Sequence, residues 1–352
     1  MKLWIFDWNF ALKGSIETYK HLEWQESYYN RGVFTLMVDD VPQNVKILKE
    51  DYFLYMPDKK TAMLIETIKY DSKDNLIIVN GHSTLTILNQ RHLYGTYNFV
   101  NAEAGIREIF AKNIRGYPNM IQTPSKGYTE GVDTQYSDKI LLDIFPKVCS
   151  ETGLGINMIF DYENKRHIFD VYKGVDRTAE QTNNSPQQFS DDWFTLTDVV
   201  ITEDKSNFKN VAYVSGVGDG PDRIRTVVGT AQGRDRYELP VDARHLQWDS
   251  DPTSENYQTY DQYVKTLGAW GLAKLNEHNK IQNFQAEVDS RDFGNKYYLG
   301  DVVTCNSGRY GVQMDARIIS FKHQIENNES KIFLTLGEPT ITAIGELKLW
   351  LS

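Results

Sequence analysis

The sequence predicts a β-dominated α+β fold with several domains. Apolar and polar residues alternate in long runs towards both ends of the chain, and helical spacing is concentrated in two blocks between them. Aromatic residues reach 12%, a content that favours half-buried β surfaces and subunit contacts. At about 150 residues per domain, a chain of 352 residues exceeds one small domain. We therefore expect two β regions, each carrying an insertion.

Residues 1–92 form the first expected β domain. A strand is predicted over 32–38, before the turn at 39–42, and another over 52–56. The runs 62–70 and 75–80 flank the segment Asp71-Ser72-Lys73-Asp74, which predicts a hairpin. A short helix is expected over 84–91.

Residues 93–200 form an expected α/β insertion domain, because the periodicity changes there. Asn101 is predicted to cap a helix with an apolar stripe through Ile106 and Phe110. Ser137-Asp138 predicts the start of a second helix, which ends at Gly153. A hairpin follows, with strands over 156–162 and 167–172, and a polar loop is expected over 178–188.

The second expected β domain comprises residues 201–254 and 281–352, interrupted by a helical insertion over 255–280. In the insertion, Tyr263, Leu267 and Leu275 follow helical spacing and predict one long amphipathic helix. The later strands are expected over 284–289, 302–305, 312–325 and 331–336.

The most informative segment is residues 210–244, which contains a glycine-rich tip. Three glycines alternate there: Gly216, Gly218 and Gly220. A phosphate-binding loop would need a helix N-terminus directly after the glycines, because free backbone N–H groups hold the phosphate. Instead Pro221 and the β-branched run 224–228 follow, so the segment predicts a long hairpin and no nucleotide site.

Aspartate and arginine recur in steps along this segment. The six residues are Asp222-Arg223, Asp235-Arg236, and Asp242 with Arg244. They are either solvated turn residues or bidentate arginine–carboxylate pairs, within the hairpin or across a subunit boundary. If they lie at a boundary, charge reversal at Arg223 or Arg236 should impair assembly more than folding.

No residue pattern predicts catalysis, a cofactor or a metal. The seven histidines lack metal-binding spacing, and Cys149 and Cys305 are expected to be buried free thiols. No nucleophile elbow is present. Neighbouring acids are expected in turns and helix caps: Asp39-Asp40, Asp191-Asp192 and Asp249-Ser250-Asp251. The acidic tip around Asp219 lacks the remaining ligands of a calcium loop.

The formal charge of -10 disfavours stable binding of nucleic acid. Asp7 interrupts the apolar start of the chain, which argues against a signal peptide. No run approaches the roughly 20 apolar residues of a membrane span. We expect a soluble product that folds in the cytoplasm where it is made.

Several segments, taken in their order and spacing, resemble one protein family. They are residues 24–38 (WQESYYNRGVFTLMV), 79–91, 171–178 (VYKGVDRT), 210–223 (NVAYVSGVGDGPDR), 234–244 (RDRYELPVDAR), 298–303 (YLGDVV) and 316–337. Together they span almost the whole chain. The chain thus resembles the hub protein of siphophage and prophage tail tips, the N-terminal structural part of tail-associated proteins.

This resemblance implies a fold similar to the central baseplate hub of contractile tails. Each subunit would contain two tube-like β-barrel or sandwich domains with α/β and helical insertions. Three subunits would form a ring that joins the tail tube or distal tail protein to the tip. The ring would open or close the channel for DNA and the tape-measure protein. The expected location is the virion, at the tail tip, after synthesis in the bacterial cytoplasm.

Longer members of the family continue into a peptidase, lysozyme or receptor-binding region. This sequence ends at Ser352, so we expect no enzymatic activity and expect receptor-binding or fibre proteins to be separate chains. Two alternatives stay open: a cell-wall hydrolase, which would need paired carboxylates, and a carbohydrate-binding module, which the aromatic content would suit.

Overall fold

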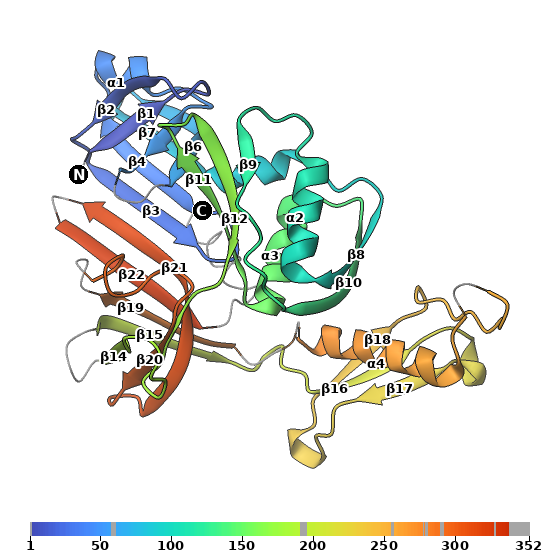
Figure 1. Ribbon diagram of the computed structural model, residues 1–352. Helices are drawn as coiled ribbons and strands as arrows, with labels where there is room; N and C mark the ends of the chain where they lie inside the picture. Colours follow the sequence, from blue (N-terminus) through green and yellow to red (C-terminus); the bar gives the residue numbers. More distant parts are fainter. Residues whose placement is uncertain are drawn as a thin grey trace. The chain divides into compact units, whose positions relative to one another are not determined.

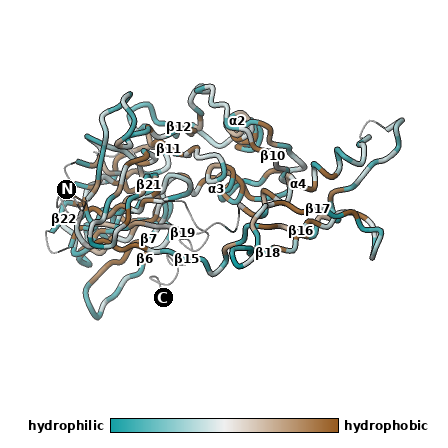
Figure 2. The backbone as a smooth tube through the Cα atoms, turned by 90° about the horizontal axis from the view of Figure 1, so that it is seen from below, coloured by the Kyte–Doolittle hydropathy of each residue, from teal (hydrophilic) through white to brown (hydrophobic). Residues whose placement is uncertain are grey.

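A computed structural model describes residues 2–57, 61–190, 196–254, 257–276, 278, 281–288, 292–326 and 329–337 (Figure 1). The chain divides into two compact units: unit 1 is Met1–Ile201 with Asn283–Ser352, and unit 2 is Thr202–Gln282. Strands account for 44% and helices for 19%, which confirms the β-dominated α+β class. In Figure 2, hydrophobic residues recur along the strands of both units. Within the described ranges no helix is long and apolar enough to span a membrane.

Unit 1 is built on a 14-stranded sheet. Its main path runs β15-β19-β22-β21-β3-β4-β7-β6-β5-β1-β2, and β13, β14 and β20 branch from β21. The N-terminal strands are β1 (Leu3–Phe6), β2 (Leu12–Ile16), β3 (His21–Ser27), β4 (Val33–Asp39), β5 (Phe53–Tyr55), β6 (Ala62–Asp71) and β7 (Leu76–Ser83). The short helix α1 (Pro42–Ile47) and the 3-10 helix η1 (Thr84–Gln90) accompany them. The predicted strands, hairpin and short helix of this region are thus present.

The later strands of the sheet come from both sides of unit 2 in the sequence. They are β13 (Asp176–Arg177), β14 (Gln188–Ser190), β15 (Leu196–Asp204), β19 (Ile281–Val288), β20 (Val302–Ser307), β21 (Val312–Glu326) and β22 (Glu329–Gly337). Strand β21 pairs antiparallel with β3, from Ser320 opposite Ser27 to Glu326 opposite His21. This pairing makes one continuous sheet of two regions that are far apart in the sequence. Each region keeps its own core, around Trp24 and Phe34 in the first and Phe284 and Phe321 in the second.

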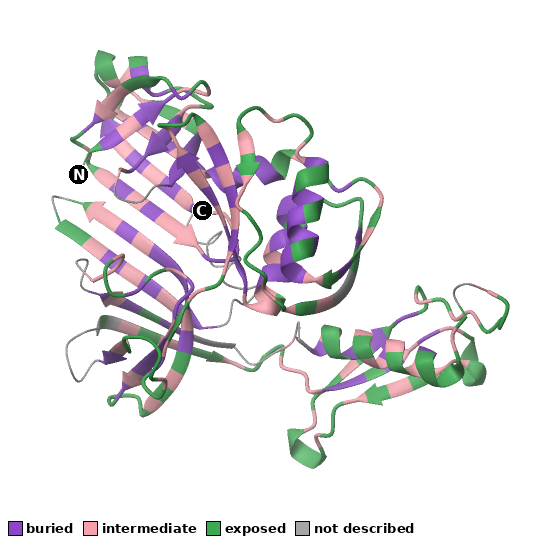
Figure 3. Cartoon of the chain, in the orientation of Figure 1, coloured by how far each residue is buried: buried purple, intermediate pink, exposed green. Residues whose placement is uncertain are grey.

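The α/β insertion lies between these regions in the sequence. Its elements are β8 (Thr96–Asn101), α2 (Ala102–Asn113), β9 (Met120–Gln122), β10 (Gly131–Ser137), α3 (Leu141–Thr152), β11 (Gly155–Asp161) and β12 (Arg166–Tyr172). Strands β8 and β10 form one small sheet, and β11, β12 and β9 form another. The inner faces of both helices are buried against them (Figure 3). The predicted cap of α2 is confirmed, because the Asn101 side chain accepts the Ala104 N–H at 2.8 Å.

The start of α3 differs from the prediction. Ser137 ends strand β10, Asp138 has a left-handed φ of 48°, and the helix begins only after Ile140. The Asp138 carboxylate accepts the N–H of Gly95 at 3.0 Å, across the neighbouring segment. A tertiary hydrogen bond therefore uses the side chain that was expected to cap the helix. The end of the helix is as expected, since Gly153 adopts a φ of 73°.

Unit 2 is a three-stranded sheet with one helix on it. Strand β16 (Val211–Ser215) lies between β17 (Arg225–Val228), which is antiparallel to it, and β18 (Glu238–Asp242), which is parallel to it. Helix α4 (Tyr260–Asn276) buries Tyr263 and Leu267 against Ala212 and Val214. Residues 201–254 were expected to continue the second β domain, but the three strands after β15 form a sheet of their own, on which the helix of the expected insertion packs.

Candidate assembly surface

The glycine-rich tip of unit 2 is a closed hairpin end. The Gly216 N–H donates to the Ile224 carbonyl at 2.8 Å, and the Ile224 N–H donates to the Val217 carbonyl at 3.0 Å. Gly218 and Gly220 have φ of 97° and 51°, a region that glycine enters without steric cost. Only a three-residue 3-10 helix, η2 (Gly220–Asp222), follows the glycines. A phosphate-binding helix N-terminus is therefore not built at this tip.

Arg223 holds the tip against strand β18. Its guanidinium donates to the carbonyls of Gly216 (2.9 Å) and Ser215 (2.8 Å), and to the Asp242 carboxylate (2.6 Å). Arg244 donates to the same carboxylate at 2.6 Å. The hydrogen bonds from the Arg244 side chain and backbone are the main reason why the pKa of Asp242 lies well below its usual range. One aspartate thus serves two arginines.

Arg236 makes the corresponding contacts at the other end of the sheet. It donates to the Glu238 carboxylate (2.6 Å), the Ala231 carbonyl (2.8 Å) and the Tyr213 hydroxyl (2.7 Å). The hydrogen bond from Arg236 also lowers the pKa of Glu238. Arginine–carboxylate pairing is present, but the partner of Arg223 is 19 residues away in the sequence.

Asp222 and Asp235 contribute differently. Their backbones take part in the turns: the Asp222 N–H donates to the Asp219 carbonyl, and the Asp235 carbonyl accepts from Asn210. Both side chains are exposed. Within the described part of the chain, their carboxylates accept no hydrogen bond and join no ion pair. They remain available to a partner, whereas Arg223 and Arg236 are already engaged.

Among the described residues of unit 2, none covers the sheet face opposite α4. Tyr213 and Val227 lie opposite each other on neighbouring strands and are 43% and 50% exposed. Pro240, opposite Tyr213 on the other side, is also exposed. The engaged arginine pairs lie around this apolar centre. An apolar centre with a polar rim is the usual composition of a protein–protein contact.

Three of the family-like segments meet inside unit 1, at Tyr28. This side chain is fully buried, and its hydroxyl accepts the Gly174 N–H at 3.0 Å and donates to the Gly153 carbonyl at 3.1 Å. A Cβ atom at Gly155 or at Gly300 would collide with its ring. Burial raises the pKa of Tyr28 to about 12. The segments 24–38, 171–178 and 298–303 therefore pack together around the Tyr28 side chain.

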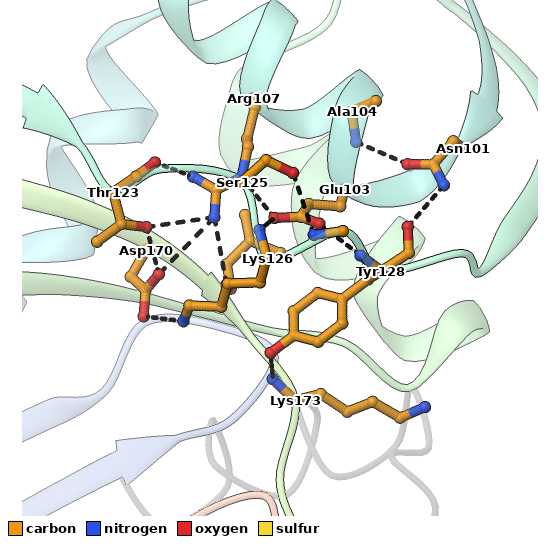
Figure 4. A network of polar contacts seen from close by, with 12 residues as sticks. Asn101, Glu103, Ala104, Arg107, Thr123, Ser125, Lys126, Tyr128, Asp170 and Lys173 are labelled. Atoms are coloured by element: carbon orange, nitrogen blue, oxygen red, sulfur yellow. Dashed lines mark hydrogen bonds and ion pairs between the residues drawn. The ribbon is translucent and has the colours of Figure 1, made fainter.

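A buried polar network in the α/β insertion was not predicted (Figure 4). The Glu103 carboxylate, 1% exposed, accepts the N–H groups of Lys126 (2.7 Å) and Tyr128 (2.8 Å) and the Arg107 Nε–H (2.8 Å). Arg107 also donates to the Thr123 carbonyl at 2.5 Å. The network holds the loop over 123–128 against α2. The sequence signal was a charged pair at i and i+4 on the apolar face of the predicted helix.

The two cysteines and the neighbouring acidic residues show no arrangement typical of a catalytic or metal site among the described residues. Cys149 and Cys305 are buried free thiols, and burial raises the pKa of both, to about 12 for Cys305. Asp249 and Asp251 accept backbone N–H groups two residues ahead, as expected of turn residues. Asp191 and Asp192 lie outside the described residues. Over the described ranges, no group of three or more histidine, cysteine or acidic side chains is placed to hold a metal ion.

Solved tail proteins share this fold. The chain is similar to a 43 kDa tail protein of prophage MuSo2 from Shewanella oneidensis (TM-score 0.63, 8% identity, covering 96% of this chain and 99% of that one). It is similar to a tail protein from Neisseria meningitidis MC58 (TM-score 0.58, 9% identity, 95% of both chains). It is also similar to prophage tail protein gp18 from Listeria monocytogenes EGD-e (TM-score 0.57, 11% identity, 98% of both chains). At these identities the likeness concerns the fold alone.

No curated protein matches the sequence. The family model described as siphovirus ReqiPepy6 Gp37-like protein matches residues 2–338, which is nearly the whole chain. The chain therefore belongs to the siphovirus ReqiPepy6 Gp37-like protein family.

Proposed function

We propose that this chain is a structural, non-enzymatic tail protein that forms the hub of the tail tip as a ring of three copies. Its membership of a siphovirus family supports the tail assignment. The shared fold supports it too, because three solved tail proteins are matched over 95% or more of both chains.

The observation that carries the hub proposal is the pairing of β21 with β3. It gives one chain two β regions, each with its own core, in a continuous sheet. Three such chains in a ring would present six β regions around one axis. The six β regions would match a six-fold tail tube above the ring, and the three chains would match a three-fold tip below it.

In the proposed ring, the partners are two further copies, the distal tail protein or tail tube protein, and the tape-measure protein. Receptor-binding or fibre proteins would attach as separate chains. DNA would pass through the channel during ejection. The formal charge of -10 supports this role, because an acidic surface repels the phosphate backbone and lets DNA slide.

The mass of the protein in solution tests the proposal. We expect a species near three times 40.6 kDa for the chain alone, or a complex with three copies of the chain after mixing with the tail-tube and distal-tail proteins. Electron microscopy of the mixture should then reveal rings of three. A chain that stays monomeric in the presence of both neighbours would refute the hub assignment.

Two activity assays test the alternatives. Clearing of Gram-positive peptidoglycan in a zymogram, lost on substitution of one carboxylate, would replace the structural proposal with a hydrolase. Binding of the isolated chain on a glycan array would favour a carbohydrate-binding module. Much of the aromatic content that motivates such a module is buried, as in the cluster of Phe6, Phe10, Phe53 and Phe160.

A further inference from the structure

We propose that the free edge of strand β8, with the groove at its start, binds an extended acidic segment of another tail protein as an added β-strand. This inference rests on the proposed tail function and names a partner surface for it. The surface, which we call the β8 edge, comprises residues 92–100 together with the last turn of α2 and Arg115 just after it. It lies in the α/β insertion of unit 1 (Figure 1).

The backbone of β8 is unpaired on one side. Among the described residues β8 pairs with β10 alone. The Asp138 N–H donates to the Gly95 carbonyl, so Gly95 directs its backbone groups towards β10. Successive residues of an antiparallel strand point their backbone N–H and C=O groups to alternate sides, so Tyr97 and Phe99 also point theirs towards β10. Thr96 and Asn98 point theirs away from β10, towards the free side of the strand. These outward N–H and C=O groups are a template for another strand.

The edge also lacks the usual protection against such pairing. Native edge strands commonly carry lysine, proline or an inward charge. Strand β2, at one end of the large sheet, carries Lys13, which pairs with Asp7 at 2.7 Å. Strand β8 reads Thr-Tyr-Asn-Phe-Val-Asn, with no charge and no proline. Val100 is 80% exposed and Tyr94, just before the strand, 82% exposed, so the edge is both open and apolar.

The groove at the start of β8 selects an acidic occupant. It is open, has a volume of about 570 Å³, and lies between residues 92–97 and the end of α2. Arg115 in its wall donates to the His92 carbonyl (2.9 Å) and the Asn113 side-chain oxygen (2.8 Å). Both acceptors are neutral, so within the described residues no carboxylate compensates this cation. Lys112, also in the wall, forms an ion pair with Glu108.

Another chain fits this edge better than a second copy does. Two β8 edges would pair antiparallel about a two-fold axis, because the same strand would supply both sides. The proposed ring is threefold, so its symmetry does not generate such a contact. Strand β8 is also uncharged, and a copy of it would bring no carboxylate to Arg115. Peptides that add to a sheet edge gain affinity from the backbone and specificity from side-chain contacts such as this one.

Photo-crosslinking in assembled tails tests the proposal. The photoreactive residue p-benzoylphenylalanine replaces Tyr94 in the full chain, and the same residue in place of Tyr70, 50% exposed, is the control position. We expect irradiation to join position 94 to an acidic segment of a different tail protein, identified by mass spectrometry. Asn98→Pro removes one outward N–H, and Asn98→Ala keeps it. The proline should lower the yield about tenfold and the alanine less than about twofold, relative to the unsubstituted edge.

Arg115→Gln tests the charge, because glutamine can still donate to the His92 carbonyl. We expect the yield to fall about fivefold and to become less sensitive to salt. A cross-link to a second copy, a cross-link to a segment without acidic residues, or equal yields for Asn98→Pro and Asn98→Ala would overturn the proposal. So would the absence of a cross-link at position 94 in tails that contain the chain. Immunoblotting of purified tails separates that result from failure of the tail function itself, in which the chain would be missing.

Discussion

Removal of the Glu103 carboxylate should destabilise the α/β insertion strongly. The substitution Glu103→Ala withdraws the acceptor from two backbone N–H groups, at Lys126 and Tyr128, and from the Arg107 guanidinium. Burial alone would raise the pKa of Glu103, but these three hydrogen bonds bring it below its usual range. The carboxylate is therefore charged in the folded protein, and its loss leaves a buried cation.

The size of the effect follows from what remains around Arg107. Removing one partner of a buried ion pair costs about 3–5 kcal/mol. The Asp170 carboxylate lies 3.9 Å from the guanidinium and compensates part of the charge. Lys126 is exposed, so its N–H can regain a hydrogen bond from water. We therefore expect the lower end of the range, about 3 kcal/mol, in the free energy of unfolding of unit 1.

Hydrogen exchange and urea unfolding measure this effect. In Glu103→Ala the amide protons of Lys126 and Tyr128 should lose their protection first. Glu108→Ala is the matched control, because Glu108 lies on the same helix and pairs with Lys112 at the same spacing, but at the surface, where it also accepts a hydrogen bond from the Tyr97 hydroxyl. Such a pair contributes about 0.3–0.5 kcal/mol. Equal effects of the two substitutions would refute the argument that burial makes the network important.

Two further predictions concern a glycine pair and a buried histidine. Gly268→Ala should stabilise unit 2 by about 0.5–1 kcal/mol, because its Cβ would meet open space and glycine disfavours helices. Gly271→Ala should destabilise it by about 1–3 kcal/mol, because its Cβ would lie 2.5 Å from Val214 Cγ2; thermal unfolding of both variants measures the difference. Burial lowers the pKa of His167 to about 4, so the unfolded chain binds a proton at higher pH than the folded one. Stability should then fall as the pH drops from about 6.5 to about 4, by up to about 3 kcal/mol, and urea unfolding of His167→Phe should lack this part of the slope.

Local patterns predicted the elements of unit 1 well. The spacing of Ile106 and Phe110, with Asn101 before them, was enough to predict α2, because a helix and its cap depend on neighbouring residues. The predicted start of α3 was wrong because the Asp138 carboxylate accepts a hydrogen bond from Gly95, a residue 43 positions away. The boundary of unit 2 depends on the parallel pairing of β16 with β18, which no local signal marks.

The candidate residues were predictable as a group, but their partners were not. The recurring aspartate and arginine left solvated turns and arginine–carboxylate pairs both open, and the structure pairs the arginines with Asp242 and Glu238. Asp222 ends the 3-10 helix η2 with its side chain exposed, whereas the Arg223 guanidinium reaches Asp242 on strand β18 at 2.6 Å. The Glu103–Arg107 network was not predicted, because the partners of the carboxylate at Lys126 and Tyr128 are 23 and 25 residues away in the sequence.

An inter-subunit role of the hairpin is better tested at Asp222 and Asp235 than at the arginines. Arg223 and Arg236 are engaged within unit 2, so Arg223→Glu would bring its carboxylate towards Asp242 and two backbone carbonyls. We expect it to destabilise unit 2 and to impair assembly only as a consequence. Asp222 and Asp235 have exposed carboxylates, and surface substitutions of this kind usually change stability by no more than about 0.5 kcal/mol.

The double substitution Asp222→Arg with Asp235→Arg therefore separates the two roles. If the hairpin contacts a neighbouring subunit, the variant should unfold like the original chain but form fewer rings, as counted by mass in solution and by electron microscopy. Asp74→Arg is the control, since Asp74 is an exposed acid on the β6–β7 turn of unit 1. Normal ring formation by the double variant would leave Arg223 and Arg236 with a purely internal role. The glycine-rich hairpin would then serve the folding of unit 2, and the ring would depend on other surfaces.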